Sequence, residues 1–175
     1  MLELDMLRKI YILIFYTLLS TTLYAEEPLL ATLESVISND VQKFGIGGYT
    51  FECTAYGVMT LEGLYNSSKV DSECKKSIDK LYVKNPKLKY YVDSVLKYKQ
   101  QYHIEIKNQE CIVYSNGQVS LSELLLKEGL AFKNLRFKDE EFDFYFSLAQ
   151  RKAKIEKNGL WSEKIFTNCT EELNK

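Results

Sequence analysis

The stretch 111–131 reads CIVYSNGQVSLSELLLKEGLA and carries the strongest local signals in the chain. Asn116-Gly117 stands between two apolar runs, and Asn-Gly readily adopts the two positive φ angles that a tight hairpin turn needs. Ser120 and Ser122 are suitable caps for a helix over Glu123–Glu128, which a glycine then ends. The stretch therefore predicts a β-hairpin that leads directly into a helix.

The chain on either side of this stretch shows both strand and helix patterns. Runs of β-branched and aromatic residues indicate strands, and apolar residues three or four positions apart indicate amphipathic helices. Asn66–Pro86 is polar with weak periodicity, so we expect a long loop there with one short helix at most. The patterns predict strands at Leu29–Ile37 (with a helix as the alternative), Val41–Phe44, Tyr49–Val58 and Tyr102–Ile106, and helices at Leu88–Tyr98 and Asp139–Lys157. Strands with attached helices predict an α+β domain built on a small barrel.

The overall composition is that of an ordinary folded domain. The chain has 175 residues, of which 46% are hydrophobic and 27% charged, and this excludes a disordered or collagen-like protein. Basic and acidic residues nearly balance, at 23 and 24. Only three of the basic residues are arginines, namely Arg8, Arg136 and Arg151. This matters because bidentate recognition of phosphate depends on arginine in particular.

Residues 1–25 are typical of an export signal. Arg8 and Lys9 precede the apolar run Ile10–Leu19, and Ala25 offers a small residue at the cleavage position. The alternative is an uncleaved membrane anchor, but the apolar run is short for a span of roughly 20 residues. We therefore expect cleavage, a periplasmic or secreted protein, and no transmembrane segment in the mature chain.

Four cysteines lie beyond the expected signal. An even number in an exported chain favours two disulfides. No CxxC pair occurs and His103 is the single histidine, so a zinc site is not expected. Four cysteines allow three pairings, and the residues by themselves leave all three open.

Charge is unevenly distributed along the chain. Residues 69–107 hold ten lysines and five acidic residues, interleaved with tyrosines, as at Lys97 and Tyr98. Lysines among aromatic rings can bind single-stranded nucleic acid by charge and stacking. The simpler interpretation is an amphipathic helix with solvated lysines.

The stretch at 111–131 resembles the staphylococcal nuclease (thermonuclease) family. The resemblance rests on Asn116–Val119, on the segment Leu124–Ala131 and on the later residues Ala149–Ser162. In that family these segments are the last barrel hairpin, the second helix and the third helix. The resemblance extends over roughly residues 30–163 and implies a five-stranded oligonucleotide-binding-type (OB) β-barrel with about three helices. We accordingly expect a domain at 26–165 and a C-terminal tail at 166–175.

The resemblance also implies calcium-dependent hydrolysis of phosphodiester bonds. Asp40 and Thr60 fall at metal-site positions of the family, and Glu62 falls at the position of the catalytic base. Met59 replaces the second metal-binding aspartate, and a thioether is a poor ligand for calcium. A rival alignment places this motif near Ser68–Asp71. Calcium is therefore expected only if the chain is active, and no cofactor otherwise.

Both arginines with which the family holds the phosphate are missing. Thr54 stands where the first is expected, and Asn108-Gln109-Glu110 where the second is. Lys107 is the nearest substitute, but a lysine is a point charge without bidentate geometry. Arg136 and Arg151 lie beyond the strands in any alignment.

Each retained residue also has a structural interpretation. Asp40 is typical of a turn, and Glu62 would be a surface charge. Phe137 falls near the nucleotide-stacking tyrosines of the family, where it would stack on a base or pack within the domain. Threading the cysteines onto the family fold puts Cys53 and Cys111 on neighbouring strands, which implies the pairs Cys53–Cys111 and Cys74–Cys169.

Three functions follow from this sequence. The first is an exported, non-catalytic nuclease-like module, a pseudoenzyme that binds a protein partner in the cell envelope, with Asn66–Pro86 as a candidate contact. The second is an active, calcium-dependent exported nuclease that uses Glu62, Asp40 and Thr60. The third is a nucleic-acid binder that does not cut, with Phe137, Lys107, Lys97 and Tyr98 as contacts.

Overall fold

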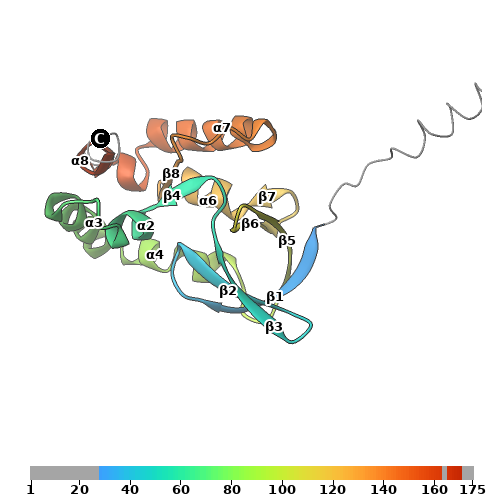
Figure 1. Ribbon diagram of the computed structural model, residues 1–175. Coiled ribbons are helices and arrows are strands. Elements are labelled where there is room, and N and C mark those ends of the chain that lie inside the picture. The colour runs from blue at the N-terminus through green and yellow to red at the C-terminus, as the bar shows by residue number, and fades with distance from the viewer. Residues whose placement is uncertain (1–27, 163–164, 171–175) are drawn as a thin grey trace, which may run out of the picture.

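A curved antiparallel sheet forms the centre of the protein, and the computed structural model describes residues 28–162 and 165–170. The six strands follow the order β3-β2-β1-β5-β6-β7, and β4 and β8 form a separate antiparallel pair (Figure 1). The strands are β1 (Leu29–Val36), β2 (Val41–Ile46), β3 (Tyr49–Thr54), β4 (Val58–Thr60), β5 (Gln101–Lys107), β6 (Glu110–Asn116), β7 (Val119–Ser120) and β8 (Ala131–Lys133).

The end of β3 meets β6, although three strands separate them in the sheet order. Ala55 forms a parallel bridge with Cys111, and the Tyr56 amide donates to the Cys111 carbonyl at 3.1 Å. The disulfide Cys53–Cys111, with 5.4 Å between its Cα atoms, joins the same two places. The predicted α+β class is confirmed, and this junction is consistent with an OB-type arrangement of β1, β2, β3, β5 and β6.

The predicted hairpin and the helix after it are present. β6 and β7 flank the turn at Gly117-Gln118, and Gly117 has a φ of 64°. The turn therefore lies one residue later than predicted, because Asn116 ends β6 and pairs with Val119. Ser120 caps the following helix through a capping box with Glu123, in which each side chain bonds to the other's backbone amide. The helix begins at Leu121, two residues before the predicted start, because Ser120 is the cap.

Helices lie above and to the left of the strands in Figure 1, and β1, β2 and β3 form the lower right part of the molecule. A core of buried apolar side chains runs continuously between sheet and helices. The described residues hold more helices than the three expected: α2 (Leu61–Asn66), α3 (Ser72–Lys84), α4 (Pro86–Lys89), α5 (Tyr91–Val95), α6 (Leu121–Lys127), α7 (Glu140–Glu156), the 3-10 turn η1 (Gly159–Trp161) and α8 (Ile165–Thr170).

The expected loop at Asn66–Pro86 is wrong, because most of it is helix α3. Asp71 caps this helix by accepting hydrogen bonds from the Glu73 and Cys74 amides at 2.9 and 2.8 Å. Cys74, Ile78 and Leu81 follow at helical spacing and are buried. The single helix expected at Leu88–Tyr98 is instead α4 and α5, which meet at Tyr90, a residue with a non-helical φ of −115°.

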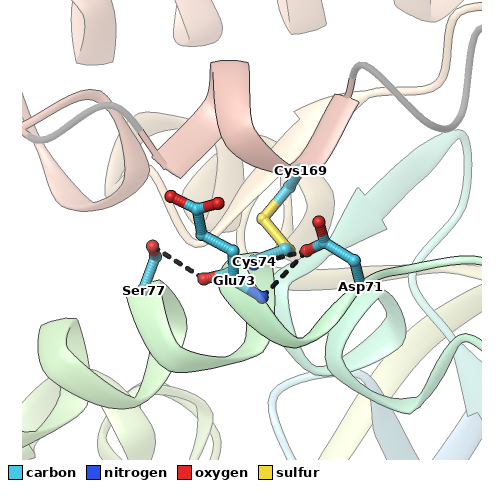
Figure 2. Close-up of a disulfide and its surroundings, with 5 residues drawn as sticks. All are labelled: Asp71, Glu73, Cys74, Ser77 and Cys169. Atoms are coloured by element: carbon cyan, nitrogen blue, oxygen red, sulfur yellow. Dashed lines mark hydrogen bonds between the residues drawn. A yellow bond between two sulfur atoms is a disulfide. The ribbon is translucent and has the colours of Figure 1, made fainter.

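The C-terminal helix α8 is attached covalently to α3. The disulfide Cys74–Cys169 joins them with 4.9 Å between the Cα atoms (Figure 2). The structure thus contains both pairs that the family resemblance implied. Residues 166–170, expected as tail, belong to α8, where Cys169 is buried.

The expected export signal at residues 1–25 lies outside the described residues. Within 28–162 and 165–170, no helix is long and apolar enough to cross a membrane.

Candidate functional site

Asp40, Thr60 and Glu62 come together where the β1–β2 turn meets the start of α2. The Thr60 hydroxyl donates to Asp40 Oδ1 at 2.6 Å and accepts the Gly63 amide at 2.9 Å as the cap of α2. Glu62 lies in the first turn of the same helix. The structure therefore gathers the three residues that the family alignment assigned to one site.

The carboxylate of Glu62 is enclosed, and only one of its oxygens is hydrogen-bonded. Oε1 accepts from Tyr82 Oη at 2.7 Å and from Asn39 Nδ2 at 2.9 Å. Oε2 is buried and has no hydrogen-bond partner among the described residues. Glu62 is therefore not the surface charge that the structural interpretation predicted.

Burial is the main cause that raises the pKa of Glu62 above its usual value. The hydrogen bonds from Tyr82 and Asn39 act in the opposite direction, and the nearby charge of Asp40 adds to the rise. Burial and the Glu62 charge also raise the pKa of Tyr82 far above its usual value, so this phenol stays protonated and donates.

Asn39 connects this site to the helices beside it. Its Nδ2 also donates to the Leu88 carbonyl at 2.8 Å, and its Oδ1 accepts the Val92 amide at 3.0 Å. The side chain is buried and bonds to α2, α4 and α5 at once. Asn39 and Tyr82 were not among the predicted site residues. Their only local signals are the position of Asn39 next to Asp40 and the helical spacing of Tyr82 from Ile78.

The positions that would hold the phosphate carry no guanidinium group. Thr54 ends β3, and Asn108 and Gln109 form a turn with positive φ values of 52° and 69°. Glu110 Oε2 accepts the Gly57 amide at 2.9 Å. Arg136 and Arg151, the two arginines of the described residues, are exposed, in the segment after β8 and on α7.

Lys107 does not act as a substitute cation at the Glu62 site. Its Nζ lies 3.3 Å from Asp139 Oδ2 and 3.4 Å from Glu141 Oε2, at the start of α7. Its charge also lies over the Tyr56 ring, 5.7 Å from the centroid. Although partial burial opposes it, hydrogen bonds from Tyr56 and Lys107 keep the pKa of Asp139 below its usual value.

The four residues predicted to contact nucleic acid lie in two separate parts of the molecule. Phe137 is half-buried and packs on Tyr56 and Phe146, with ring centroids 5.4 and 5.3 Å away. It is therefore close to Lys107, which also lies over Tyr56. Lys97 and Tyr98 are exposed at the opposite end of β5, so the four residues form no single surface.

The residues at this site do not fit a calcium ion. Calcium takes six to eight oxygen ligands. Asp40 Oδ1 is bonded to Thr60, Glu62 Oε1 is bonded twice, and half-buried Met59 offers only a thioether. No group of three or more His, Cys, Asp or Glu side chains suited to a metal occurs within residues 28–162 and 165–170.

Comparison with protein families shows to which family the chain belongs. The family model described as staphylococcal nuclease homologue matches residues 73–163. The chain belongs to this family. The match runs from α3 through η1, so it includes the hairpin and helices that carried the resemblance, whereas Asp40, Thr60 and Glu62 precede it. No significant match was found among curated proteins.

Proposed function

We propose that this staphylococcal nuclease homologue is a non-catalytic binding module that acts in the periplasm or is secreted. The observation that carries the proposal is the Glu62 network, in which the carboxylate at the family's base position bonds to Asn39 and Tyr82. The network joins the β1–β2 turn to α2 and α3. A carboxylate in that position supports the architecture of the domain and is poorly placed to activate water.

A general base needs a free lone pair within reach of the water that it deprotonates. Neither oxygen of the Glu62 carboxylate is available to a water molecule. Oε1 already accepts two hydrogen bonds, and Oε2 is buried away from solvent. Asp40 likewise accepts a short hydrogen bond from the cap of α2. These contacts support a structural role for both carboxylates.

Phosphodiester hydrolysis also needs fixed positive charge where negative charge develops on the phosphate. Loss of a single such donor typically slows a reaction by about 10²–10³-fold. Thr54 and the segment Asn108-Gln109-Glu110 stand where the family has arginines, and Lys107 is paired to Asp139 and Glu141. Together with the missing metal ligand at Met59, these changes support a chain without nuclease activity.

Export is supported by the cysteines and by the N-terminal sequence. All four cysteines form disulfides, and disulfides persist mainly in oxidising compartments. The apolar segment Ile10–Leu19 behind Arg8 and Lys9 has the length of the hydrophobic region of a signal peptide. We therefore propose a protein partner in the cell envelope as the ligand of the module.

A nuclease assay tests the proposal directly. The oxidised protein, purified from an exporting host, is incubated with calcium and single-stranded DNA, double-stranded DNA or RNA. We expect no cleavage above that of an identically purified Glu62→Gln variant. Cleavage that is robust in the natural protein and lost in both Glu62→Gln and Asp40→Asn would refute the proposal and establish a calcium-dependent nuclease.

Binding of nucleic acid without cleavage is the second candidate, favoured by one feature of the surface. Tyr98 and Lys99 are exposed together, with the Lys99 charge 5.4 Å from the centre of the Tyr98 ring, in the lysine-rich segment. This candidate predicts binding of a labelled single-stranded oligonucleotide that weakens steeply with salt and with Tyr98→Ala. Anisotropy that stays unchanged at low salt would exclude it.

A further inference from the structure

Helix α7 has two apolar faces, and only one of them is covered by the domain. Phe142, Phe146 and Ala153 on the inner face are buried. On the outer face Phe144, Leu148 and Ile155 are 67%, 55% and 71% exposed. The helix runs along the outside of the molecule, at the top of Figure 1. Three large apolar side chains on one exposed stripe indicate a contact surface.

The outer stripe has the spacing of a coiled-coil seam. Glu141, Phe144, Leu148, Arg151 and Ile155 follow one another at intervals of three, four, three and four residues. This repeat places all five on one line along a helix that packs against another helix. The helix has 17 residues and a length of about 25 Å, which is enough for a short helix pair.

Charge divides the outer face of α7 into two halves. The first turn carries Glu140, Glu141 and Asp143, so it is acidic. The last two turns carry Arg151, Lys152 and Lys154 against a single acid, Glu156, which lies 3.8 Å from Lys152 Nζ, so they are basic overall. Two such helices side by side in parallel would bring like charges together. In the antiparallel orientation the acidic end of each helix faces the basic end of the other.

We infer that the outer face of α7 binds a second copy of this chain as an antiparallel, two-fold symmetric helix pair. Leu148 lies at the middle of α7, so the symmetry axis passes beside it and the two Leu148 side chains meet. A rise of about 1.5 Å per residue then puts Glu141 level with Ile155 of the partner copy and Phe144 nearly level with Arg151 of the partner copy.

The charged residues beside the seam match in the same register. Glu141 comes within about three residues' rise of Lys152 of the partner copy, and Tyr145 comes within about one residue's rise of the same lysine. Those are a charge pair and a cation–π pair, each formed twice by the symmetry. The surface is thus complementary to itself, and this makes a second copy the occupant. The inference goes beyond the proposed function and does not depend on whether the chain cuts nucleic acid.

Sedimentation velocity of the oxidised protein tests the pairing. We expect the apparent mass to rise from one copy towards two as concentration increases. Leu148→Glu places two like charges at the axis and should leave a single copy at every concentration. Val83→Glu is the matched control, since Val83 is 79% exposed on α3 and should not affect the pairing. A natural protein that stays a single copy throughout would overturn the inference.

A charge exchange tests the antiparallel register independently of apolar packing. Glu141→Lys and Lys152→Glu each create like-charge contacts and should weaken pairing by about 3–10-fold, because each contact occurs twice. The double variant Glu141→Lys/Lys152→Glu should restore the natural affinity. Two single effects that simply add in the double variant would refute this register.

Discussion

The contribution of the hydrogen bond between Tyr82 and Glu62 to stability can be measured. Tyr82→Phe removes only the hydroxyl that donates to Glu62 Oε1 at 2.7 Å, and leaves the ring in place. A hydrogen bond to a charged group contributes about 1.5–3 kcal/mol, whereas one between neutral groups contributes about 0.5–1.5 kcal/mol. We therefore expect Tyr82→Phe to lower the free energy of unfolding by about 1.5–3 kcal/mol at a pH where Glu62 is ionised.

The pH dependence of this loss has a definite sign. Burial raises the pKa of Glu62 in the folded state, so stability falls as pH rises from the unfolded value through the folded pKa. The Tyr82 hydrogen bond lowers that pKa, and its removal raises it further. The natural protein and the variant should therefore differ least in acid, where Glu62 is protonated, and most above the folded pKa.

Urea unfolding of the oxidised protein, repeated across a range of pH, provides the measurement. Tyr98→Phe is the control, because Tyr98 is 65% exposed and should change the unfolding free energy by less than about 0.5 kcal/mol. The reasoning fails if Tyr82→Phe matches this control at neutral pH. It also fails if the difference grows on acidification.

Three further changes probe other contacts, each measured by urea unfolding. Gly57→Ala should lower the free energy of unfolding by about 1–3 kcal/mol more than Gly47→Ala does. Both glycines have a positive φ, but only a Cβ at position 57 would clash with an aromatic ring. Equal losses in the two variants would contradict this. Asp139→Asn should cost about 1 kcal/mol at neutral pH, since it replaces charge-assisted bonds with neutral ones. The depressed pKa of Asp139 means that this loss shrinks as pH falls through the folded value, and a loss that is constant with pH would argue against it. Cys74→Ser with Cys169→Ser opens a loop of sequence separation 95 and should cost about 2–5 kcal/mol; an unchanged midpoint would refute this.

The hairpin and helix at 111–131 could be predicted because their signals are local. Gly117 supplies the positive φ that the turn needs, and Ser120 caps α6 within three residues. Helix α3 was missed although Asp71 and the spacing of Cys74, Ile78 and Leu81 were present. The many lysines of α3 weaken the apolar pattern by which a helix is recognised in a sequence. The buried side of α3 packs against α8, a contact between distant segments that no local pattern shows.

The site was predictable only as far as the family alignment reached. Asp40 and Glu62 lie 22 positions apart, and the alignment alone implied that they share a site. The partners that enclose Glu62 could not be found this way. Asn39 reaches it from the β1–β2 turn and Tyr82 from α3, and their meeting depends on how α3 and α4 pack against the sheet.

The two disulfides interleave along the chain, in the order Cys53, Cys74, Cys111 and Cys169, with the first joined to the third and the second to the fourth. A single cut anywhere between Cys53 and Cys169 therefore falls inside at least one covalent loop. A protease that nicks an exposed turn such as Gly117-Gln118 leaves two fragments that remain one molecule. A cut before Cys53, as in the Gly47-Gly48 turn, leaves an N-terminal piece that only non-covalent contacts retain. The interleaved disulfides therefore keep the fragments of most single cuts within one covalent molecule.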